Sequence, residues 1–335
     1  MTGGTKYTAE DLKIMQAWSL ERKIQVTQTR IIEWYEKNNG KVYVSFSGGK
    51  DSTVLLDLVR RIYPDVPAVF CDTGLEYPEI REFVKTFDNV TWIKPEKSFR
   101  KVILEDGYPV VSKEVSMLLH YAMEKPDSLT GQRALKKLDN TFSYNGVISR
   151  YNCSKYKYLL DAPFKIHNAC CDIMKKRPAH RYCKETGRLP ILATMADESR
   201  LRTQAWMRVG CNAFDSARPR SAPMSFWTEQ DVLEYLVKYN LPYASVYGEI
   251  KQSEDGKWYT TGLSRTGCVF CAYGVHLEKE PNRFQKLKQT HPQLHEYCMK
   301  PVDQGGLGIA EVLDYMGIPY DVQEDQQIQM EFEEE

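Results

Sequence analysis

The spacing of apolar and polar positions predicts strands that alternate with helices along much of the chain. Apolar residues dominate positions 42–46 and 90–94, and a further buried strand is predicted at 68–74, which ends in small polar residues. Stretches with helical spacing join these strands, and a fourth strand is predicted at 189–193. Strands connected in this order form a parallel sheet with right-handed crossovers. We therefore predict an α/β fold, in which a parallel sheet carries helices on both faces.

Helical patterns precede and follow this sheet region. A capping-box sequence begins at Thr8, and the amphipathic spacing after it continues to an Asn-Asn-Gly stop near residue 40. A segment without the strand and helix alternation interrupts the sheet region and is predicted to be a mostly helical insertion. We predict an N-terminal helical segment at 1–40, a sheet domain at 41–275 with the insertion at about 105–165, a C-terminal helical segment at 276–323 and a disordered tail at 324–335.

Charge changes this picture only modestly. The formal net charge is zero, but the tail at 324–335 holds six acids and no base, so the rest of the chain carries +6 by subtraction. This excess permits a nucleotide or nucleic-acid partner without demanding one. The first residues lack a secretory signal pattern, and no apolar run reaches the length of a bilayer. We expect a cytoplasmic protein with no membrane partner.

The junction between the first strand and its helix reads Ser47-Gly48-Gly49-Lys50-Asp51-Ser52. Glycine permits a positive φ, and the first amides of the following helix have no internal partners, so they point into the bend. The helix dipole, the Lys50 charge and the two serine hydroxyls all favour an anion there. The alternative is an ordinary strand-to-helix turn.

A second group of polar residues follows the next strand, at Asp72, Thr73 and Gly74. Ligands of parallel sheets bind outside the carboxyl ends of the strands, so we expect these residues to lie near the loop at 47–52. Asp72 is a candidate for holding Mg²⁺ or contacting the nucleotide, and the alternative is an Asx turn that closes the strand. Lys113 is a candidate substrate contact, with a solvated surface lysine as the alternative.

The chain has nine cysteines, an odd number that argues against a secreted disulfide framework. Two pairs stand out, Cys170 with Cys171 and Cys268 with Cys271. Four thiolates suit an iron–sulfur cluster, and the basic residues at 175–177 would offset its negative charge. Zinc and unliganded thiols remain the alternatives, although adjacent cysteines form a poor zinc knuckle. Most of the other five cysteines are expected to be buried bystanders.

Several motifs together resemble a known family. The loop at 47–52 is similar to the pyrophosphate loop of the ATP pyrophosphatase superfamily. Behind it, in the same order, the chain resembles the phosphoadenosine-phosphosulfate and adenylyl-sulfate reductase family. The motifs that carry this resemblance are Cys-Cys-x-x-x-Lys-x-x-Pro at 170–178, Trp-Thr-x-x-Asp-Val at 227–232, Leu-Pro-Tyr at 241–243 and Gly-Cys-x-x-Cys at 267–271.

The resemblance implies an adenine nucleotide alpha hydrolase-like fold, with ATP and Mg²⁺ as cofactors. It implies a [4Fe-4S] cluster on Cys170, Cys171, Cys268 and Cys271. Basic residues near the substrate sulfate or phosphate fall at Arg200 and Arg202, although arginine is also common on exposed turns. The catalytic candidates are Lys50, Asp51 and Asp72, and the nucleotide-binding candidates are Ser47, Gly48, Gly49, Lys50, Asp51, Ser52, Asp72, Thr73 and Gly74.

Two departures from the reductases matter. These enzymes carry a catalytic cysteine in a Glu-Cys-Gly motif near the carboxyl terminus, whereas this chain has Glu296-Tyr297-Cys298-Met299. Adenylyl-sulfate reductases have a degraded phosphate loop, whereas the loop at 47–52 is complete. This combination is similar to the iron–sulfur ATP pyrophosphatases of the family that act in nucleic-acid sulfur modification, including DNA phosphorothioation.

Three functional hypotheses follow. The first is an ATP pyrophosphatase that adenylates a substrate for sulfur transfer, with a DNA or RNA acceptor and a sulfur-donor or complex partner protein. The second is a reductase of an adenylated sulfate, with Cys298 or another thiol as the nucleophile. The third is a non-catalytic nucleotide sensor or nucleic-acid-binding subunit. Fold-level analogy alone does not choose among them.

Overall fold

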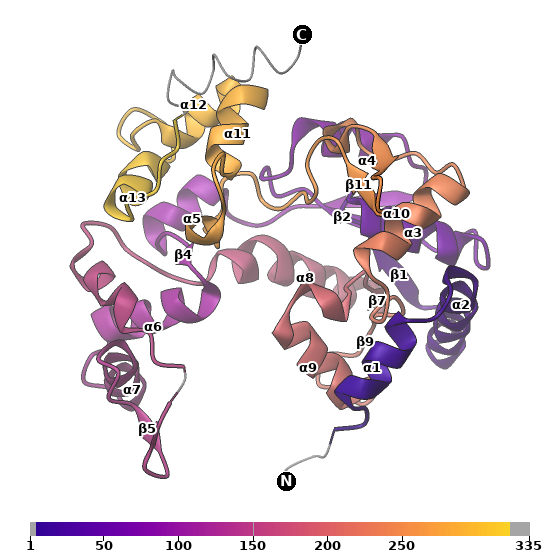
Figure 1. Cartoon of the computed structure of the whole chain (residues 1–335), viewed down its shortest axis with the longest axis horizontal. Helices are drawn as coiled ribbons and strands as arrows, with labels where there is room; N and C mark the ends of the chain where they lie inside the picture. The colour runs from indigo at the N-terminus through magenta and orange to yellow at the C-terminus, as the bar shows by residue number, and fades with distance from the viewer. Residues whose placement is uncertain (1–4, 150, 322–335) are drawn as a thin grey trace. The chain divides into compact units, whose positions relative to one another are not determined.

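The computed structural model describes residues 5–149 and 151–321, which fall into two compact units (Figure 1). The first unit combines residues up to 95 with residues 177–267. The second unit combines residues 96–176 with residues from 268 onward. The predicted disordered tail at 324–335 lies outside the described residues.

The first unit is built on a six-stranded sheet with the strand order β3-β2-β1-β7-β9-β8. All neighbouring strands pair in parallel except β8, which runs antiparallel to β9. The parallel sheet predicted from sequence is confirmed, and the predicted fourth strand is β7. The strands are β1 Val42–Ser45, β2 Ala68–Cys71, β3 Val90–Ile93, β7 Leu189–Ile191, β8 Asn212–Ala213 and β9 Arg220–Ser221.

The helices of the first unit flank this sheet. The apolar face of α3 is buried, and the helix contacts β1, α2 and α10. The described part of the unit also contains two 3-10 turns, η3 Ala196–Glu198 and η4 Ser245–Tyr247, and a hairpin of β10 Ile250–Gln252 with β11 Trp258–Thr260. The helices are α1 Ala9–Gln16, α2 Leu20–Lys37, α3 Lys50–Arg60, α4 Pro78–Lys85, α8 Arg177–Thr186, α9 Arg200–Val209 and α10 Glu229–Lys238.

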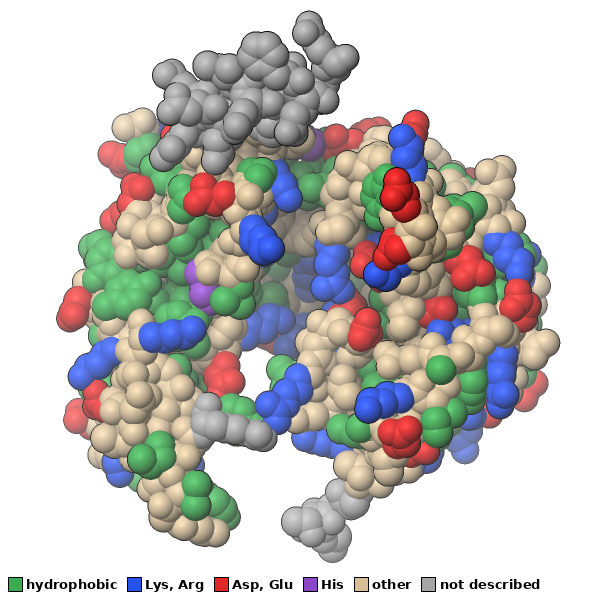
Figure 2. Space-filling view, in the orientation of Figure 1, with side chains coloured by type: hydrophobic (Ala, Val, Ile, Leu, Met, Phe, Trp, Pro, Cys, Tyr) green, Lys and Arg blue, Asp and Glu red, His purple; other side chains and the backbone are tan. Residues whose placement is uncertain are grey.

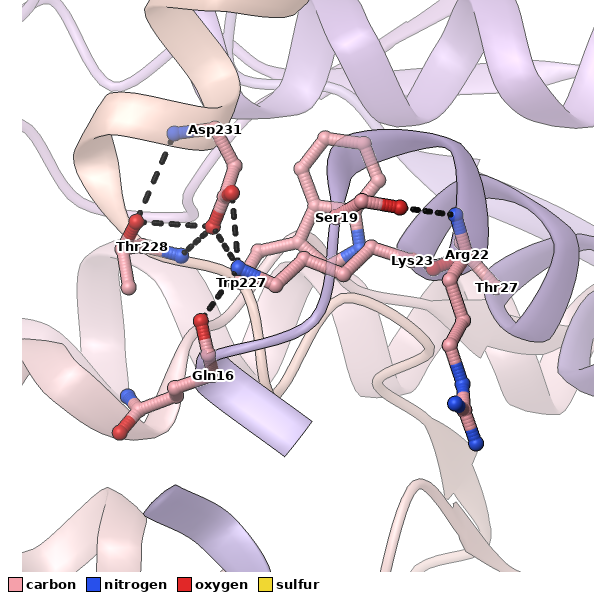
Figure 3. Close-up of polar contacts among 8 residues, drawn as sticks. All are labelled: Gln16, Ser19, Arg22, Lys23, Thr27, Trp227, Thr228 and Asp231. Carbon is pink, nitrogen blue, oxygen red and sulfur yellow. Dashed lines mark hydrogen bonds and ion pairs between the residues drawn. The ribbon is translucent and has the colours of Figure 1, made fainter. Parts of the chain in front are cut away.

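Buried polar contacts fix the N-terminal helix α2 to the start of α10 (Figure 3). The Lys23 ammonium donates to both carboxylate oxygens of Asp231 at 2.7 Å, and the Lys23 side chain is only 2% exposed. One turn further along α2, Thr27 accepts a hydrogen bond from the Trp227 indole at 2.8 Å. Asp231 also closes the capping box of α10 with Thr228. The N-terminal helices therefore belong to the first unit, and they hold the amino end of α10 in place.

The second unit is mainly helical. A short parallel pair, β4 Val110–Val111 with β12 Ala272–Tyr273, joins its two chain segments. A hairpin of β5 Ser143–Tyr144 and β6 Val147–Ile148 leaves apolar side chains exposed, visible as green at the tip in Figure 2. The helices are α5 Phe99–Glu105, α6 Lys113–Glu124, α7 Leu129–Leu138, η1 Ser154–Asp161, η2 Asp172–Lys176, η5 Val275–Leu277, α11 Arg283–Thr290, α12 Pro292–Met299 and α13 Ile309–Tyr315.

The predicted insertion at 105–165 contains helices, as expected, together with the β5–β6 hairpin. Among the residues that the structure describes, no helix combines the length and apolar character that crossing a membrane requires.

Candidate functional site

The predicted anion loop joins β1 to α3 through a bend whose shape depends on Gly48. This residue has a φ of 72°, which side chains other than glycine rarely adopt. A Cβ at this position would lie 2.7 Å from Val84 Cγ2 and 2.8 Å from Ile80 Cγ2, both on α4. Gly49, in contrast, is extended and forms the N-cap of α3. Helix α4 therefore packs directly on the bend, and only glycine fits at position 48.

The two serines of the loop close the bend internally. The Ser52 hydroxyl accepts from the Ser47 backbone N–H at 3.2 Å and donates to the Gly49 carbonyl at 2.9 Å. The two serine hydroxyl oxygens lie 3.0 Å apart. These contacts hold the loop in the shape that presents the first turn of α3. A direct bond from either serine to an anion stays a prediction.

Lys50 is buried, and its donors bind other groups of the protein. Its ammonium lies 2.6 Å from the Ser264 carbonyl oxygen and 2.9 Å from a carboxylate oxygen of Glu229. Its backbone N–H donates to the Tyr247 hydroxyl at 3.2 Å, and that hydroxyl lies 2.7 Å from the Thr266 hydroxyl. The residues 245–266 therefore contribute a second wall to the loop, which the sequence motifs did not reveal.

Asp51 carries the most unusual carboxylate of the site. Its Oδ1 atom is buried and has no hydrogen-bond partner among the described residues. Burial raises the pKa of the Asp51 carboxyl, and the nearby Glu229 charge adds to this effect. The positive charges of Lys50, Arg265 and Arg202 oppose it. The Asp51 carboxyl thus lies within electrostatic range of three cations, and its Oδ1 atom is available to a ligand.

The two arginines of this group are joined by Glu198. One carboxylate oxygen of Glu198 lies 3.0 Å from Arg265, and the other is ion-paired with Arg202. Burial, followed by the neighbouring Arg265 charge, lowers the pKa of the Arg202 guanidinium. Arg202, predicted from sequence to contact substrate, therefore lies within electrostatic range of Asp51. Arg200 begins α9 and is exposed, and within residues 5–149 and 151–321 no hydrogen bond or ion pair joins it to the loop.

The second predicted group lies at the carboxyl end of β2, which pairs with β1. Asp72 is buried, and its carboxylate lies 3.0 Å from the Arg81 guanidinium of α4. Thr73 donates its hydroxyl and its backbone N–H to Glu76, at 2.6 and 3.1 Å. Gly74 has a φ of 71°. An ion pair with Arg81 thus holds Asp72, and its role toward Mg²⁺ or nucleotide stays a prediction.

Lys113 belongs to a different unit of the chain from the loop. It is the first residue of α6, is exposed, and belongs to the second unit. Its predicted contact with substrate stays a prediction.

The four predicted ligand cysteines all belong to the second unit. Cys170 and Cys171 immediately precede the π-helical turn η2, and π turns are frequent at functional sites. Cys268 and Cys271 form a turn, in which the Cys271 backbone N–H donates to the Cys268 carbonyl at 3.1 Å. Burial raises the pKa of the Cys170 thiol, and the charges of the other three cysteines add to this effect. The two pairs, far apart in sequence, are thus near enough to interact electrostatically.

No metal geometry is formed by these thiols. Throughout the described residues, no three His, Cys, Asp or Glu side chains stand in an arrangement that could hold a metal ion. Burial, followed by the Cys268 charge, raises the pKa of the Cys271 thiol to about 11, so this sulfur is protonated at neutral pH. A bound metal would have to displace that proton. The predicted [4Fe-4S] cluster stays a prediction.

Cys298 is unsuited to nucleophilic chemistry in this fold. Its side chain is 0% exposed, and burial raises the pKa of its thiol well above the usual range. The thiolate is the reactive form of cysteine, and an apolar burial suppresses it. The structure therefore gives no support to Cys298 as the nucleophile of a reductase.

Sequence reasoning found the loop but missed the residues that surround it. Glu229 lies inside the Trp-Thr-x-x-Asp-Val motif at 227–232, and Arg265 and Thr266 directly precede the Gly-Cys-x-x-Cys motif at 267–271. Both motifs indicated the family. Neither motif predicted that residues at its variable positions, or next to it in the sequence, would contact the loop. Tyr247 and Glu198 had no such signal.

Comparison with known proteins now decides the family. A family model described as the phosphoadenosine phosphosulfate reductase domain matches residues 41–109 and 113–273. The matched residues make up more than half of the chain and contain the loop, Asp51, the arginines and all four predicted ligand cysteines. The chain belongs to the phosphoadenosine phosphosulfate reductase family. The N-terminal helices α1 and α2 and the helices after residue 273 lie outside the matched range.

The chain is also similar to curated proteins. An adenosine 5'-phosphosulfate reductase of Staphylococcus haemolyticus is 25% identical over 269 residues, covering 75% of this chain and 87% of the relative. An uncharacterized protein of Methanocaldococcus jannaschii is 31% identical over 299 residues, covering 88% of this chain and 55% of the relative. This chain thus spans only about half the length of that second relative.

A solved structure gives a weaker match. The crystal structure of phosphoadenylyl-sulfate reductase from Candida auris in a phosphate complex aligns with a TM-score of 0.38 and 15% identity. The alignment covers 76% of this chain and 100% of that chain. A similarity this low supports no inference about the site.

Proposed function

We propose that this family member binds ATP with Mg²⁺ at residues 47–52 and cleaves it to AMP and pyrophosphate. In the proposed reaction, an oxygen of an acceptor attacks the α-phosphate, the bond between the α- and β-phosphates breaks, and pyrophosphate leaves. The adenylated acceptor then loses AMP when sulfur attacks it. The proposal extends the family assignment to a particular reaction.

The buried, unpartnered Oδ1 of Asp51 is the observation that carries this proposal. A carboxylate oxygen without a partner, beside the amino end of α3, suits a hard cation that binds oxygen ligands. Asp51 would hold Mg²⁺ here, and the ion, when bound, would neutralise part of the phosphate charge. An ordinary strand-to-helix turn gives no reason to bury such a group at a cost in stability.

The cations around Asp51 suit the charge that develops during the reaction. Pyrophosphate departure concentrates negative charge on the leaving group, and fixed cations and helix amides lower that barrier. Lys50 lies at the amino end of α3, where the helix dipole also favours an anion. Arg202 and Arg265 place two further guanidinium groups within electrostatic range of Asp51. These groups bind and orient the phosphates.

The cysteines of the second unit form a separate part of the proposal. Cys170, Cys171, Cys268 and Cys271 would hold the [4Fe-4S] cluster, because four interacting thiols in one unit match the ligand set of such clusters. Lys175 is close enough to Cys170 to lower the pKa of its thiol. When bound, the cluster would supply redox or sulfur-transfer capacity. Iron near four atoms per chain, with matching sulfide, in an anaerobic preparation would support this set.

The acceptor and the partner proteins are part of the proposal. The complete loop, together with the four cysteines, resembles the iron–sulfur ATP pyrophosphatases that modify nucleic acids. A DNA or RNA acceptor is compatible with the basic balance of the chain outside its tail. A sulfur-donor protein would be needed to complete the reaction.

The proposed function is tested with ATP labelled at the α-phosphate. We expect the purified protein with Mg²⁺, a nucleic-acid acceptor and sulfide as the sulfur source to release labelled AMP and unlabelled pyrophosphate, and Lys50→Ala to reduce the rate at least tenfold. Lys85→Ala, a surface lysine of α4 that is ion-paired with Glu82, is the matched control. ATP binding without turnover under every condition would instead favour the nucleotide sensor.

A second candidate is reduction of an adenylated sulfate, favoured by the relative from Staphylococcus haemolyticus that carries that name. Its test is sulfite release from adenylyl sulfate or its 3′-phosphorylated form in the presence of a thiol reductant. The buried Cys298 counts against this candidate, because its sulfur has no access to solvent. Sulfite release without loss in Cys298→Ala would require another nucleophile.

A further inference from the structure

The anion-binding donors of the loop are occupied by acceptors of the protein itself. The Lys50 backbone N–H, which belongs to the first turn of α3, donates to the Tyr247 hydroxyl at 3.2 Å. The Lys50 ammonium is shared between the Ser264 carbonyl and the Glu229 carboxylate, at 2.6 and 2.9 Å. Oxygen atoms thus take the places at Lys50 that phosphate oxygens would take.

We propose that Tyr247 and Glu229 are positioning residues that occupy these donors until nucleotide binds and that thereby set the affinity of the loop for phosphate. The inference rests on the proposed function and goes beyond it, because it assigns a competing role to two residues outside the loop. Nucleotide must displace both oxygens from Lys50, so their removal strengthens phosphate binding.

Tyr247 contacts Lys50 with both its hydroxyl and its ring. The hydroxyl lies against Gly49 and is hydrogen-bonded to Thr266, and the Lys50 ammonium lies 5.6 Å from the ring centroid. Burial raises the pKa of Tyr247 to about 12, so the hydroxyl is neutral and is a weaker partner for the N–H than a charged phosphate oxygen. A phenylalanine keeps the ring but leaves the Lys50 N–H without its acceptor. This loss destabilises the unliganded state selectively, since phosphate supplies a new acceptor when it binds.

Glu229 competes through charge. Its carboxylate is 46% exposed while the Lys50 side chain is 4% exposed, so the acid can turn to solvent and leave the lysine in the site. In its present position it places a negative charge beside the loop, and it raises the pKa of Asp51. That charge repels phosphate. Glutamine removes the charge and keeps the shape.

The position of Glu229 is fixed from outside the family domain. It is the first residue of α10, whose amino end is held by the Lys23 ion pair with Asp231 and by the bond between Thr27 and Trp227 (Figure 3). Helix α2, which supplies Lys23 and Thr27, lies outside residues 41–273 that match the family. The competing carboxylate is therefore presented by a rigid helix start.

The test is isothermal titration calorimetry of the full chain with magnesium pyrophosphate and with magnesium ATP. We expect Tyr247→Phe and Glu229→Gln each to bind pyrophosphate about tenfold more tightly than the wild type, the size of one net hydrogen bond to a charged group. Both variants should melt at lower temperature than the wild type without ligand. Tyr243→Phe and Glu234→Gln are matched controls. The Tyr243 hydroxyl accepts from the Ile250 backbone N–H, Glu234 lies further along α10, and within the described residues no hydrogen bond or ion pair joins either side chain to the loop at 47–52, so both variants should bind as the wild type does.

The outcomes separate this inference from the proposed function. If the wild type binds neither ligand and Lys50→Ala changes nothing, the proposed function fails and this inference fails with it. If the wild type binds, Lys50→Ala weakens binding, and both Tyr247→Phe and Glu229→Gln bind equally or more weakly, the inference alone is overturned. Weaker binding of Tyr247→Phe would mean that its hydroxyl donates to the phosphate.

Discussion

Asp51 shows how a single buried side chain can indicate a ligand site. Its carboxyl has an ordinary pKa of 3.8, and burial raises that value in the folded chain. In the pH range between the two values, the folded state binds more protons than the unfolded state, so stability falls as pH rises through this range. Above the folded-state pKa, burial of the ionised Asp51 carboxylate therefore lowers the free energy of unfolding by its full amount.

We expect Asp51→Asn to raise the free energy of unfolding by about 1 kcal/mol at neutral pH, because the amide is less costly to bury than the carboxylate. The gain should largely vanish near pH 3, below the ordinary pKa of 3.8, where the wild-type carboxyl is mostly protonated in both states. Urea unfolding at the two pH values measures this difference. Mg²⁺ with ATP should raise the melting temperature of the wild type and not of the variant. An equal gain at both pH values would contradict the assignment of the cost to ionisation.

A second prediction at this scale concerns Cys298. Because its side chain is fully buried, Cys298→Ala should lower the free energy of unfolding by roughly 1 kcal/mol and leave the rate of AMP or sulfite formation unchanged. Unfolding curves and product assays on the same preparation separate stability from chemistry. If Cys298→Ala is fully folded but no longer releases sulfite, Cys298 would again be a candidate nucleophile.

At the scale of elements, the bend between β1 and α3 depends on its contact with α4. Gly48→Ala combines a left-handed backbone with a Cβ that overlaps Ile80 and Val84, so we expect a loss of roughly 2 to 4 kcal/mol. Gly187→Ala is the matched control, since Gly187 has a φ of 67° and no atom within 4 Å of an added Cβ. Urea unfolding should show a smaller loss for the control. Equal losses would mean that backbone strain alone accounts for the effect.

The contact between α2 and α10 makes another prediction. Lys23→Met leaves the Asp231 carboxylate buried without its cation, which should cost about 3 to 5 kcal/mol. Adding Asp231→Asn should recover part of this loss, because the amide removes the charge and can still accept the capping bonds. A double-mutant cycle measured by urea unfolding gives the coupling energy. A coupling energy near zero would show that the pair contributes nothing beyond its packing.

The elements could be predicted from sequence better than the contacts between them. The run from Val42 to the loop and the apolar face of α3 has the period of a buried strand followed by an amphipathic helix, and both elements formed as predicted. Strands β8 and β9 have two residues each, too few for any period to show. Tyr247 and Ser264 reach Lys50 across 197 and 214 positions. Such contacts depend on tertiary packing, and no local pattern encodes them.

At the scale of the whole molecule, each compact unit is assembled from two separate stretches of chain. Cys171 lies shortly before the chain leaves the second unit at residue 176, and Cys268 is the first residue after its return. A cluster on the four cysteines would close the loop formed by the intervening residues, and closing a loop of this length restricts the unfolded chain.

We therefore expect Cys171→Ser to lose most of its iron and to melt at lower temperature than the wild type, when both are prepared without oxygen. Cys153→Ser, in the same unit and half-buried, is the matched control and should keep its iron. Iron and zinc analysis with thermal melting measures both effects. Zinc in place of iron, lost in the same variant, would assign the thiols to a zinc site.

Each unit contains two segments that are far apart in the sequence, and this separation also affects folding during translation. Strand β12 of the second unit follows its partner β4 only after the whole of residues 177–267. At translation speeds of about 5 to 20 residues per second, Cys171 leaves the ribosome roughly 5 to 20 seconds before Cys268. During that interval the first thiol pair is synthesised without its partners. Assembly of the proposed cluster on all four cysteines would therefore have to wait until Cys271 has been translated.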